Sequence, residues 1–214
     1  MLTIWGRASA LNVQKVVWAA DEIGVKYRRI DAGRTFGVVD TPEYRALNPN
    51  GKVPVIDDDG FVLWESNVIV RYLCMRHHRE DLCPSDIRRR ADAERWMDWQ
   101  TVEVLPCYRV ALALVRGLTP GLTREQVETA FTQTNALLSV LEAQLAKTAF
   151  VAGDSFTMGD IPIGLIVHNW LRADWPLPPF PNLRRWHGAL GARPGAQAAF
   201  VEPLAGMINV GGQA

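Results

Sequence analysis

Residues 48–73 decide the fold, and they read NPNGKVPVIDDDGFVLWESNVIVRYL. Within this stretch, residues 53–56 and 61–64 are short apolar runs, and the acidic segment 57–60, which ends in glycine, joins them. β-Branched and aromatic runs separated by such a turn predict a β-hairpin. Apolar residues recur at helical spacing after Ser66, so the hairpin is expected to lead directly into a helix.

Pro54 is unusual inside an apolar run, because proline removes a backbone donor from a sheet. A cis bond between Val53 and Pro54 turns the chain there and leaves the Val53 N–H and C=O facing outward. An extended peptide pairs with such a backbone by strand addition. The N–H groups at the helix start and the Ser66 hydroxyl suit a carboxylate, and Glu65 suits an amine beside it. These groups predict a site for a short peptide with a free amino-acid end, such as glutathione.

The whole run resembles the glutathione-binding half of the cytosolic glutathione transferases. The resemblance rests on Lys52, on the Val53-Pro54 pair, on the hairpin, and on Glu65 and Ser66 opening a helix. It looks like a bacterial serine- or asparagine-type member, theta-like or nu-like. The resemblance implies a thioredoxin-like α/β N-terminal domain, an all-α C-terminal domain, glutathione as co-substrate and a homodimer.

The first 78 residues fit this architecture. Residues 2–5 and 26–30 predict strands with a helix between them that ends at Gly24, and residues 42–47 predict a short helix after Pro42. With the hairpin and the helix after it, residues 1–78 read β-α-β-α-β-β-α. That is the thioredoxin-like order.

The remainder reads as helical, and residues 87–214 are expected to form the second domain with the electrophile pocket. Residues 87–115 predict a long helix bent near Pro106, which lacks a backbone donor. Residues 123–126 form a capping box that opens the next helix.

A second helix start is predicted at Thr157 and Asp160, with Phe156 and Ile161 spaced as a hydrophobic staple. It resembles the capping motif that precedes the buried core helix of the family. We expect it to serve folding rather than chemistry.

Composition narrows the function further. Lys and Arg total 23, as do Asp and Glu, so net charge offers no argument for nucleic acid or an anionic membrane as a partner. No apolar stretch approaches the roughly 20 residues that span a bilayer, and the N-terminus lacks a secretory leader pattern. Cys74, Cys83 and Cys107 are scattered, suit a reducing cytoplasm and form no metal-ligand spacing with histidines. We expect a cytoplasmic protein without a metal.

Glutathione transferases need a donor that stabilises the glutathione thiolate, since a free cysteine thiol has a pKa near 8.5. One hydrogen bond to a charged group contributes about 1.5–3 kcal/mol, which lowers a pKa by about one to two units. The donor must stand in the loop between the first strand and the first helix, where Ser9 and Asn12 lie.

Related transferases carry a hydroxyl residue two places before the position matching Asn12, and this chain has Ala10 there. We therefore expect Asn12 to be the donor, with Ser9 as the next candidate. The alternatives are that Ser9 is an ordinary loop hydroxyl and that Asn12 is a simple helix N-cap.

The resemblance implies further site residues. Lys52 is expected to reach the glycyl carboxylate, although it equally suits a solvated loop lysine. Arg34 and Phe36 lie where the family covers the glycyl end. Tyr108 and Arg109 are expected to face the electrophile from the second domain.

These residues predict an enzyme that conjugates the glutathione thiolate to a small hydrophobic electrophile. One alternative is a glutathione-dependent disulfide or peroxide reductase, in which Asn12 stabilises the same thiolate. The other is a non-catalytic ligand-binding protein that kept the fold. The loop holds no cysteine, which argues against direct glutaredoxin-like exchange, and the intact peptide site argues against the non-catalytic alternative.

Overall fold

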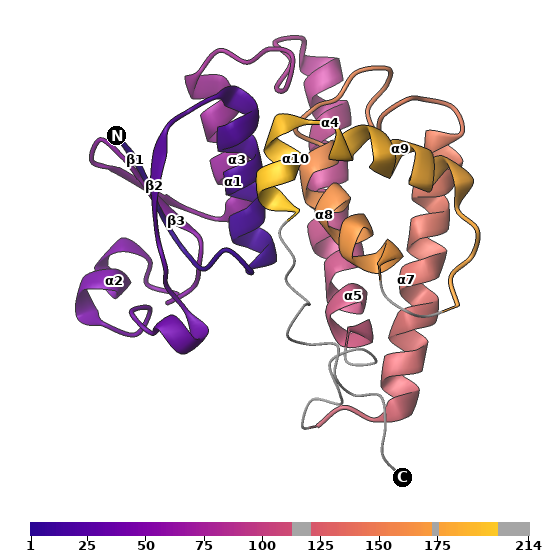
Figure 1. Cartoon of the computed structure of the whole chain (residues 1–214), viewed down its shortest axis with the longest axis horizontal. Helices are drawn as coiled ribbons and strands as arrows, with labels where there is room; N and C mark the ends of the chain where they lie inside the picture. The colour runs from indigo at the N-terminus through magenta and orange to yellow at the C-terminus, as the bar shows by residue number, and fades with distance from the viewer. Residues whose placement is uncertain (113–120, 173–175, 201–214) are drawn as a thin grey trace.

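The computed structural model describes residues 1–112, 121–172 and 176–200. A small β-sheet with its helices lies on one side of the molecule and a group of longer helices lies on the other (Figure 1). None of the described helices combines the length and apolar character needed to cross a membrane.

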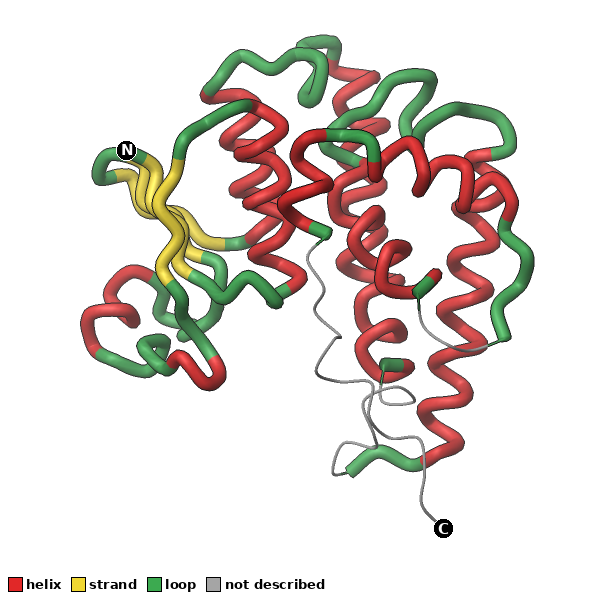
Figure 2. The backbone as a smooth tube through the Cα atoms, in the orientation of Figure 1, coloured by secondary structure: helices red, strands yellow, loops and turns green. Residues whose placement is uncertain are grey.

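The sheet has four strands in the order β2-β1-β3-β4 (Figure 2). β1 runs parallel to β2 and antiparallel to β3, and β3 runs antiparallel to β4. Helices α1 and α3 cover one face, and α2 covers the other through Tyr44, which packs against Val55. The chain order β-α-β-α-β-β-α confirms the thioredoxin-like prediction. The elements are β1 (Leu2–Trp5), α1 (Leu11–Ile23), β2 (Tyr27–Ile30), α2 (Pro42–Leu47), β3 (Val55–Asp58), β4 (Phe61–Trp64) and α3 (Ser66–Arg76).

The hairpin differs from its prediction in register. The strand predicted over residues 53–56 begins two residues later, because Val53 and Pro54 lie outside the sheet and their bond is cis. The turn is correspondingly shorter and consists of Asp59 and Gly60, with φ values of 50° and 93°. Two consecutive positive φ values are what a two-residue type I′ hairpin requires.

The helical group begins with a helix that changes type along its length. α4 (Ile87–Trp99) continues into a π-helical turn (Gln100–Val104) and then into α5 (Leu105–Ala111). The predicted bend near Pro106 therefore takes the form of a widened turn just before that proline. The last residues of the predicted helix, 113–115, lie outside the described residues.

α7 (Arg124–Leu145) opens with the predicted capping box. The Thr123 hydroxyl accepts a hydrogen bond from the Gln126 N–H at 3.2 Å, and the Thr123 N–H donates to the Gln126 side chain at 2.8 Å. Two N–H groups that a helix start leaves free are satisfied in this way.

The last three described helices are α8 (Asp160–Leu171), α9 (Pro181–Gly191) and α10 (Pro194–Ala199). The sequence analysis missed α10, a six-residue helix that is too short to show an apolar period. α10 packs against α1, and a Cβ atom on Gly195 would lie 2.4 Å from the Trp18 side chain. Only glycine allows this approach.

A buried carboxylate joins the start of α8 to the segments around it. Asp160 accepts hydrogen bonds from the N–H of Val151 at 3.0 Å, the N–H of Thr157 at 2.9 Å and the indole of Trp186 at 2.9 Å. The Thr157 hydroxyl lies 3.3 Å from the same carboxylate. Burial raises the pKa of Asp160 to about 6, while these donors favour its ionised form. The predicted cap is wrong in its position, because α8 begins at Asp160 and its N-cap is Gly159, which makes no side-chain cap hydrogen bond. Asp160 instead ties the start of α8 to α9 through Trp186.

Asp160→Ala is expected to lower the free energy of unfolding by about 3 kcal/mol or more, because several buried donors lose their acceptor. Urea unfolding at pH 7 measures this change. Asp154→Ala, which removes an exposed carboxylate from the same loop, is the matched control and should shift stability by less than about 0.5 kcal/mol. Equal unfolding midpoints for the two variants would contradict the role given to Asp160.

Candidate active site

The register of the sheet brings three predicted site segments together at one end of the strands. Trp5 pairs with Val55, and Val55 pairs with Trp64, so these residues lie side by side. β1 leaves the sheet at this end toward the loop with Ser9, β3 enters from Val53, and β4 leaves into α3. The candidate active site therefore forms where these three segments meet.

The backbone of Val53 is held in position by contacts to its neighbour. The Lys52 C=O accepts hydrogen bonds from the Tyr44 hydroxyl at 2.9 Å and from Asn48 Nδ2 at 2.8 Å. Among the described residues, neither the N–H nor the C=O of Val53 has a hydrogen-bond partner. The bond to Pro54 is cis, as the sequence predicts. This arrangement leaves Val53 available for strand addition.

The start of α3 presents a second set of polar groups. Glu65 precedes the helix with φ of 75° and ψ of 105°, a conformation that non-glycine residues adopt rarely and mostly at functional sites. Ser66 is the first helical residue and is only 5% exposed, and its hydroxyl has no protein partner within the described part of the chain. Free N–H groups, this hydroxyl and the helix dipole together suit a carboxylate.

Asn12 and Ser9, the two candidate hydrogen-bond donors to the thiolate, differ in position and burial. α1 begins at Leu11 with Ala10 as its N-cap, so Asn12 lies inside the first turn and is not the cap. The Oδ1 atom of Asn12 is buried and has no hydrogen-bond partner among the described residues. Ser9 is exposed on the loop just before the buried Ala10.

Lys15 is a buried charged residue that the sequence analysis missed. Its Nζ atom donates to Gln100 Oε1 at 2.9 Å, and both side chains are almost fully buried. The pKa of Lys15 is lowered to about 7, mainly by burial and also by the positive charge of Arg109, while the negative charge of Glu65 acts in the opposite direction. Lys15 follows Asn12 by three residues on one helix, and that spacing is the signal that points to the site.

A second polar link joins α3 to the helical group. Asn67 Nδ2 donates to the Met97 C=O at 2.9 Å and to the Thr101 hydroxyl at 3.0 Å. The Lys15 and Asn67 contacts both end on the π-helical turn or on the helical turn before it. Such widened turns occur frequently at functional sites.

Tyr108 and Arg109, the two residues expected to face the electrophile, differ in their exposure to solvent. Tyr108 is 3% exposed, and its ring centroid lies 6.0 Å from that of Trp170. Arg109 is exposed, and its charge acts on Lys15.

The segment predicted to cover the glycyl end forms a short 3-10 helix, Arg34–Phe36. Arg34 has a positive φ of 53°, and both Arg34 and Phe36 are exposed. Arg34 lies close enough to Arg7 for its charge to lower the pKa of Arg7, although burial of Arg7 is the larger cause. The sequence analysis did not single out Arg7. Lys52 is exposed beside Val53.

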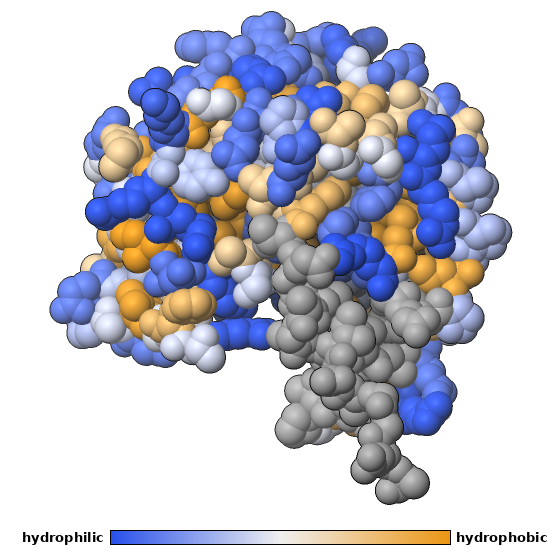
Figure 3. Space-filling view, in the orientation of Figure 1, coloured by the Kyte–Doolittle hydropathy of each residue, from blue (hydrophilic) through white to orange (hydrophobic). Residues whose placement is uncertain are grey.

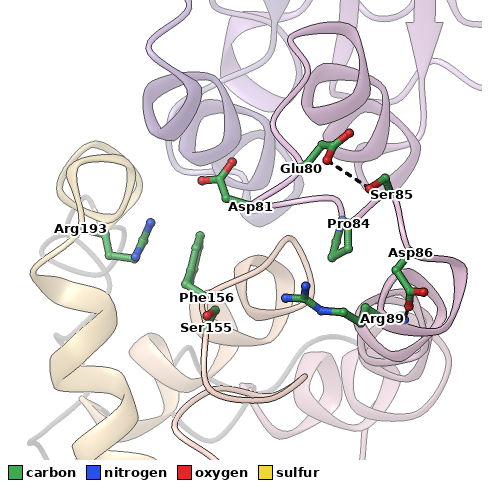
Figure 4. A pocket seen from close by; sticks show the side chains of 9 residues that line it. All are labelled: Glu80, Asp81, Pro84, Ser85, Asp86, Arg89, Ser155, Phe156 and Arg193. Carbon is green, nitrogen blue, oxygen red and sulfur yellow. Dashed lines mark hydrogen bonds between the residues drawn. The ribbon is translucent and has the colours of Figure 1, made fainter.

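A separate cavity of about 650 Å³ lies between the α3–α4 connection, the loop before α8 and the start of α10 (Figure 4). Several of the charged residues that line it contact other residues of the protein. Glu80 accepts from Ser85 at 3.1 Å, and Arg193 lies 3.8 Å above the Phe156 ring. Arg193 also forms an ion pair with Glu22. These contacts make the cavity a structural junction.

Within the described ranges, no three His, Cys, Asp or Glu side chains gather as a metal ion requires. Cys74, Cys83 and Cys107 all carry free thiols. Burial raises the pKa of Cys74 to about 12, so its thiol is unreactive.

Lys15→Met fills the same space without a charge and tests the burial of the lysine. The pKa of Lys15 is about 7 in the folded protein against an ordinary value of 10.5, so the unfolded chain binds more protons between these pH values. The free energy of unfolding of the wild type should therefore rise with pH above 7, by up to about 1.4 kcal/mol per pH unit.

Urea unfolding between pH 7 and 9.5 measures this slope, which Lys15→Met should flatten. Lys26→Met, at an exposed lysine, should retain it. A slope that is identical in both variants would show that Lys15 is not buried as a titrating group.

Comparison with known proteins identifies the family. The family model for the glutathione S-transferase N-terminal domain matches residues 1–74, and that for the C-terminal domain matches residues 109–194. Glutathione S-transferase GstB of Escherichia coli is 38% identical over 209 residues, which cover 95% of this chain and 100% of that protein.

Two solved structures are also similar. A theta class glutathione S-transferase from Xanthomonas axonopodis pv. citri with glutathione bound has a TM-score of 0.88 at 40% identity, covering 94% of this chain and 97% of that one. A delta-class glutathione transferase of Nilaparvata lugens has a TM-score of 0.86 at 27% identity, covering 97% and 96%. The chain therefore belongs to the glutathione S-transferase family.

Proposed function

We propose that this protein is a glutathione transferase, which activates the glutathione thiol and conjugates it to a small electrophile. The observation that carries the proposal is the sheet register, because it brings the free Val53 backbone, the start of α3 and the Asn12 loop to one edge. These groups match the three parts of the tripeptide. The similar Xanthomonas protein, solved with glutathione bound, supports the same ligand.

The binding mode follows from the chemistry of each group. The Val53 N–H and C=O pair with the cysteinyl residue by strand addition. The γ-glutamyl carboxylate accepts from Ser66 and the first N–H groups of α3, and Glu65 holds the γ-glutamyl ammonium. Lys52, with Arg34 and Phe36 beside it, attracts the glycyl carboxylate.

The thiolate is stabilised from the start of α1. Asn12 is suited to donate through its side-chain amide, and the positive end of the α1 dipole acts in the same direction. In the reaction the thiolate attacks the electrophilic carbon, a carbon–sulfur bond forms, and the leaving group departs with its electron pair. The thiol proton goes to solvent.

Asn12→Ala is expected to raise the pH midpoint of kcat/KM by about one to two units, because one hydrogen bond to the thiolate is lost. Ser9→Ala should shift the midpoint much less. Ala10→Ser restores a hydroxyl at the place where relatives carry one and should lower the midpoint or raise the rate. The measurement is the pH profile of the three variants with one chloroaromatic substrate.

The reverse pattern is a large shift of the pH midpoint in Ser9→Ala with a midpoint near wild type in Asn12→Ala. It would show that Ser9, and not Asn12, stabilises the thiolate. A rate with a mixed disulfide that exceeds every conjugation rate would favour the reductase alternative over the transferase.

We further propose a role for each domain, a cellular compartment and a homodimer. Residues 1–78 form the glutathione-binding domain and residues 87–214 carry the electrophile pocket. The protein acts in the cytoplasm, since its three free cysteines suit a reducing compartment.

It forms a homodimer through apolar side chains that β4 and α3 expose, namely Phe61 (49% exposed), Val68 (44%) and Met75 (48%). On the face of the molecule shown in Figure 3, hydrophilic residues are interspersed with the apolar ones.

Phe61→Lys combined with Val68→Lys is expected to convert the dimer to a monomer, because it places charges on an apolar contact. Sedimentation velocity at micromolar concentration measures the change. Val140→Lys, at an equally exposed valine on α7, should leave the dimer intact. A wild-type protein that sediments as a monomer would refute the assembly.

A further inference from the structure

Two histidines of the helical group form a hydrogen bond that joins α8 to α9. His168 Nδ1 lies 3.1 Å from His187 Nε2, and Arg172 Nη1 lies 3.0 Å from His168 Nε2. His168 is only 8% exposed, and His187 is partly buried. The proposed function makes no use of this pair.

These two contacts fix the positions of the protons. A guanidinium can only donate, so His168 Nε2 accepts the hydrogen bond from Arg172. A neutral imidazole has one donor and one acceptor nitrogen, so the proton of His168 lies on Nδ1 and is donated to His187 Nε2. The arrangement is therefore complete only while both imidazoles are neutral.

An added proton breaks the arrangement at either ring. On His168 it places an N–H against that of Arg172, and on His187 it places an N–H against that of His168. Among the described residues, the charged groups that act on His187 are Arg172 and Arg184, and both are positive. The pKa of His187 is lowered, mainly by burial and also by these two charges. Glu142 of α7, the helix that packs on α9, is engaged with N–H groups at the start of α9.

The two imidazoles together form the surface on which Phe200 stacks. The Phe200 ring centroid lies 3.9 Å from that of His168, with the planes 9° apart, and 5.5 Å from that of His187. Phe200 also meets the Trp18 indole of α1 at 5.1 Å, and α10 itself packs on α1 (Figure 1). α10 (Pro194–Ala199) contains no titratable side chain. The two histidines are thus the titratable groups in this contact between α10 and the rest of the protein.

We propose that His168, His187 and Phe200 form a pH-sensitive latch, which holds the end of α10 against α1 while both histidines are neutral and releases it when either takes up a proton. A protonated imidazole can still stack on a phenyl ring, but it cannot keep both of its nitrogen contacts, so the ring has to turn. The two imidazoles then no longer lie together against Phe200. The latch is independent of the proposed transferase chemistry, because none of its residues belongs to the candidate active site.

The size of the effect follows from proton linkage. Histidine has an ordinary pKa of about 6.5, so the released pair takes up two protons as the pH falls through this value, whereas the closed pair takes up none. The equilibrium constant for opening should rise by about ten-fold per histidine between pH 7.5 and 5.5, and so by about 100-fold for the pair.

The other titratable groups near these helices do not produce this effect. Asp160, at the opposite end of α8, has a pKa raised to about 6. Its sign is opposite, because a raised carboxyl pKa makes the folded protein retain a proton and favours the folded state as the pH falls. Arg193, which precedes α10, is paired with Glu22 and stays charged throughout this range.

Hydrogen exchange of the α10 amides measures the opening. The Phe200 N–H, for example, donates to the Ala196 C=O at 2.7 Å. After correction for the intrinsic effect of pH, exchange in α10 should become about 100-fold faster from pH 7.5 to 5.5 in the wild type. His187→Gln keeps an acceptor near the position of Nε2 but takes up no proton. It should leave α10 protected at pH 7.5 and reduce the acceleration to about ten-fold.

His77→Gln is the matched control, because it removes an exposed histidine at the end of α3. It should keep the full acceleration of the wild type. Equal accelerations in His187→Gln and His77→Gln would overturn the proposal. So would corrected exchange in wild-type α10 that does not change with pH, or that accelerates no more than exchange in α3 and α7.

Phe200→Leu tests the latch without altering a histidine. It removes the ring that the two imidazoles hold, so α10 should exchange rapidly at pH 7.5 and show little further acceleration at pH 5.5. Protection at pH 7.5 equal to that of the wild type, together with the full acceleration on acidification, would show that Phe200 is not held by the pair and would overturn the proposal.

Discussion

The burial of α1 is the constraint on which the rest of the structure depends. One side of this helix packs on the sheet through Val13, Val16 and Val17, and the other packs on the helical group through Trp18 and Ala19. A helix enclosed on both sides leaves little room around it. This is why the chain has glycine at positions 164 and 195, where a Cβ atom would meet the Trp18 side chain.

The same enclosure shapes the candidate active site. Because α1 is buried all round, Lys15 has no path to solvent and is satisfied by Gln100 of the π-helical turn. The start of α1 remains accessible at the edge of the sheet, and there Asn12 and the helix dipole meet the peptide site.

The polar groups that stabilise the fold differ from those that are available to a ligand. Asp160 is buried, accepts hydrogen bonds from three segments of the helical group, and has no contact with the proposed site. Glu65 and Ser66 show the opposite pattern, since Glu65 is exposed in a strained conformation and the Ser66 hydroxyl has no protein partner within the described part of the chain. Polar groups satisfied internally stabilise the fold, whereas polar groups left free at a helix start are available to a ligand.

Local patterns in the sequence determined the element order, the capping box at Thr123 and the hairpin that leads into a helix at Ser66, because turns, caps and apolar periods act over a few residues. Only the tertiary structure decided the rest. It buried Tyr108, revealed α10, and placed the Arg7 guanidinium beside Gly33. It also enclosed Lys15 against Gln100, which lies 85 positions away in the chain. Burial and charge pairing depend on neighbours distant in sequence, and no local pattern specifies them.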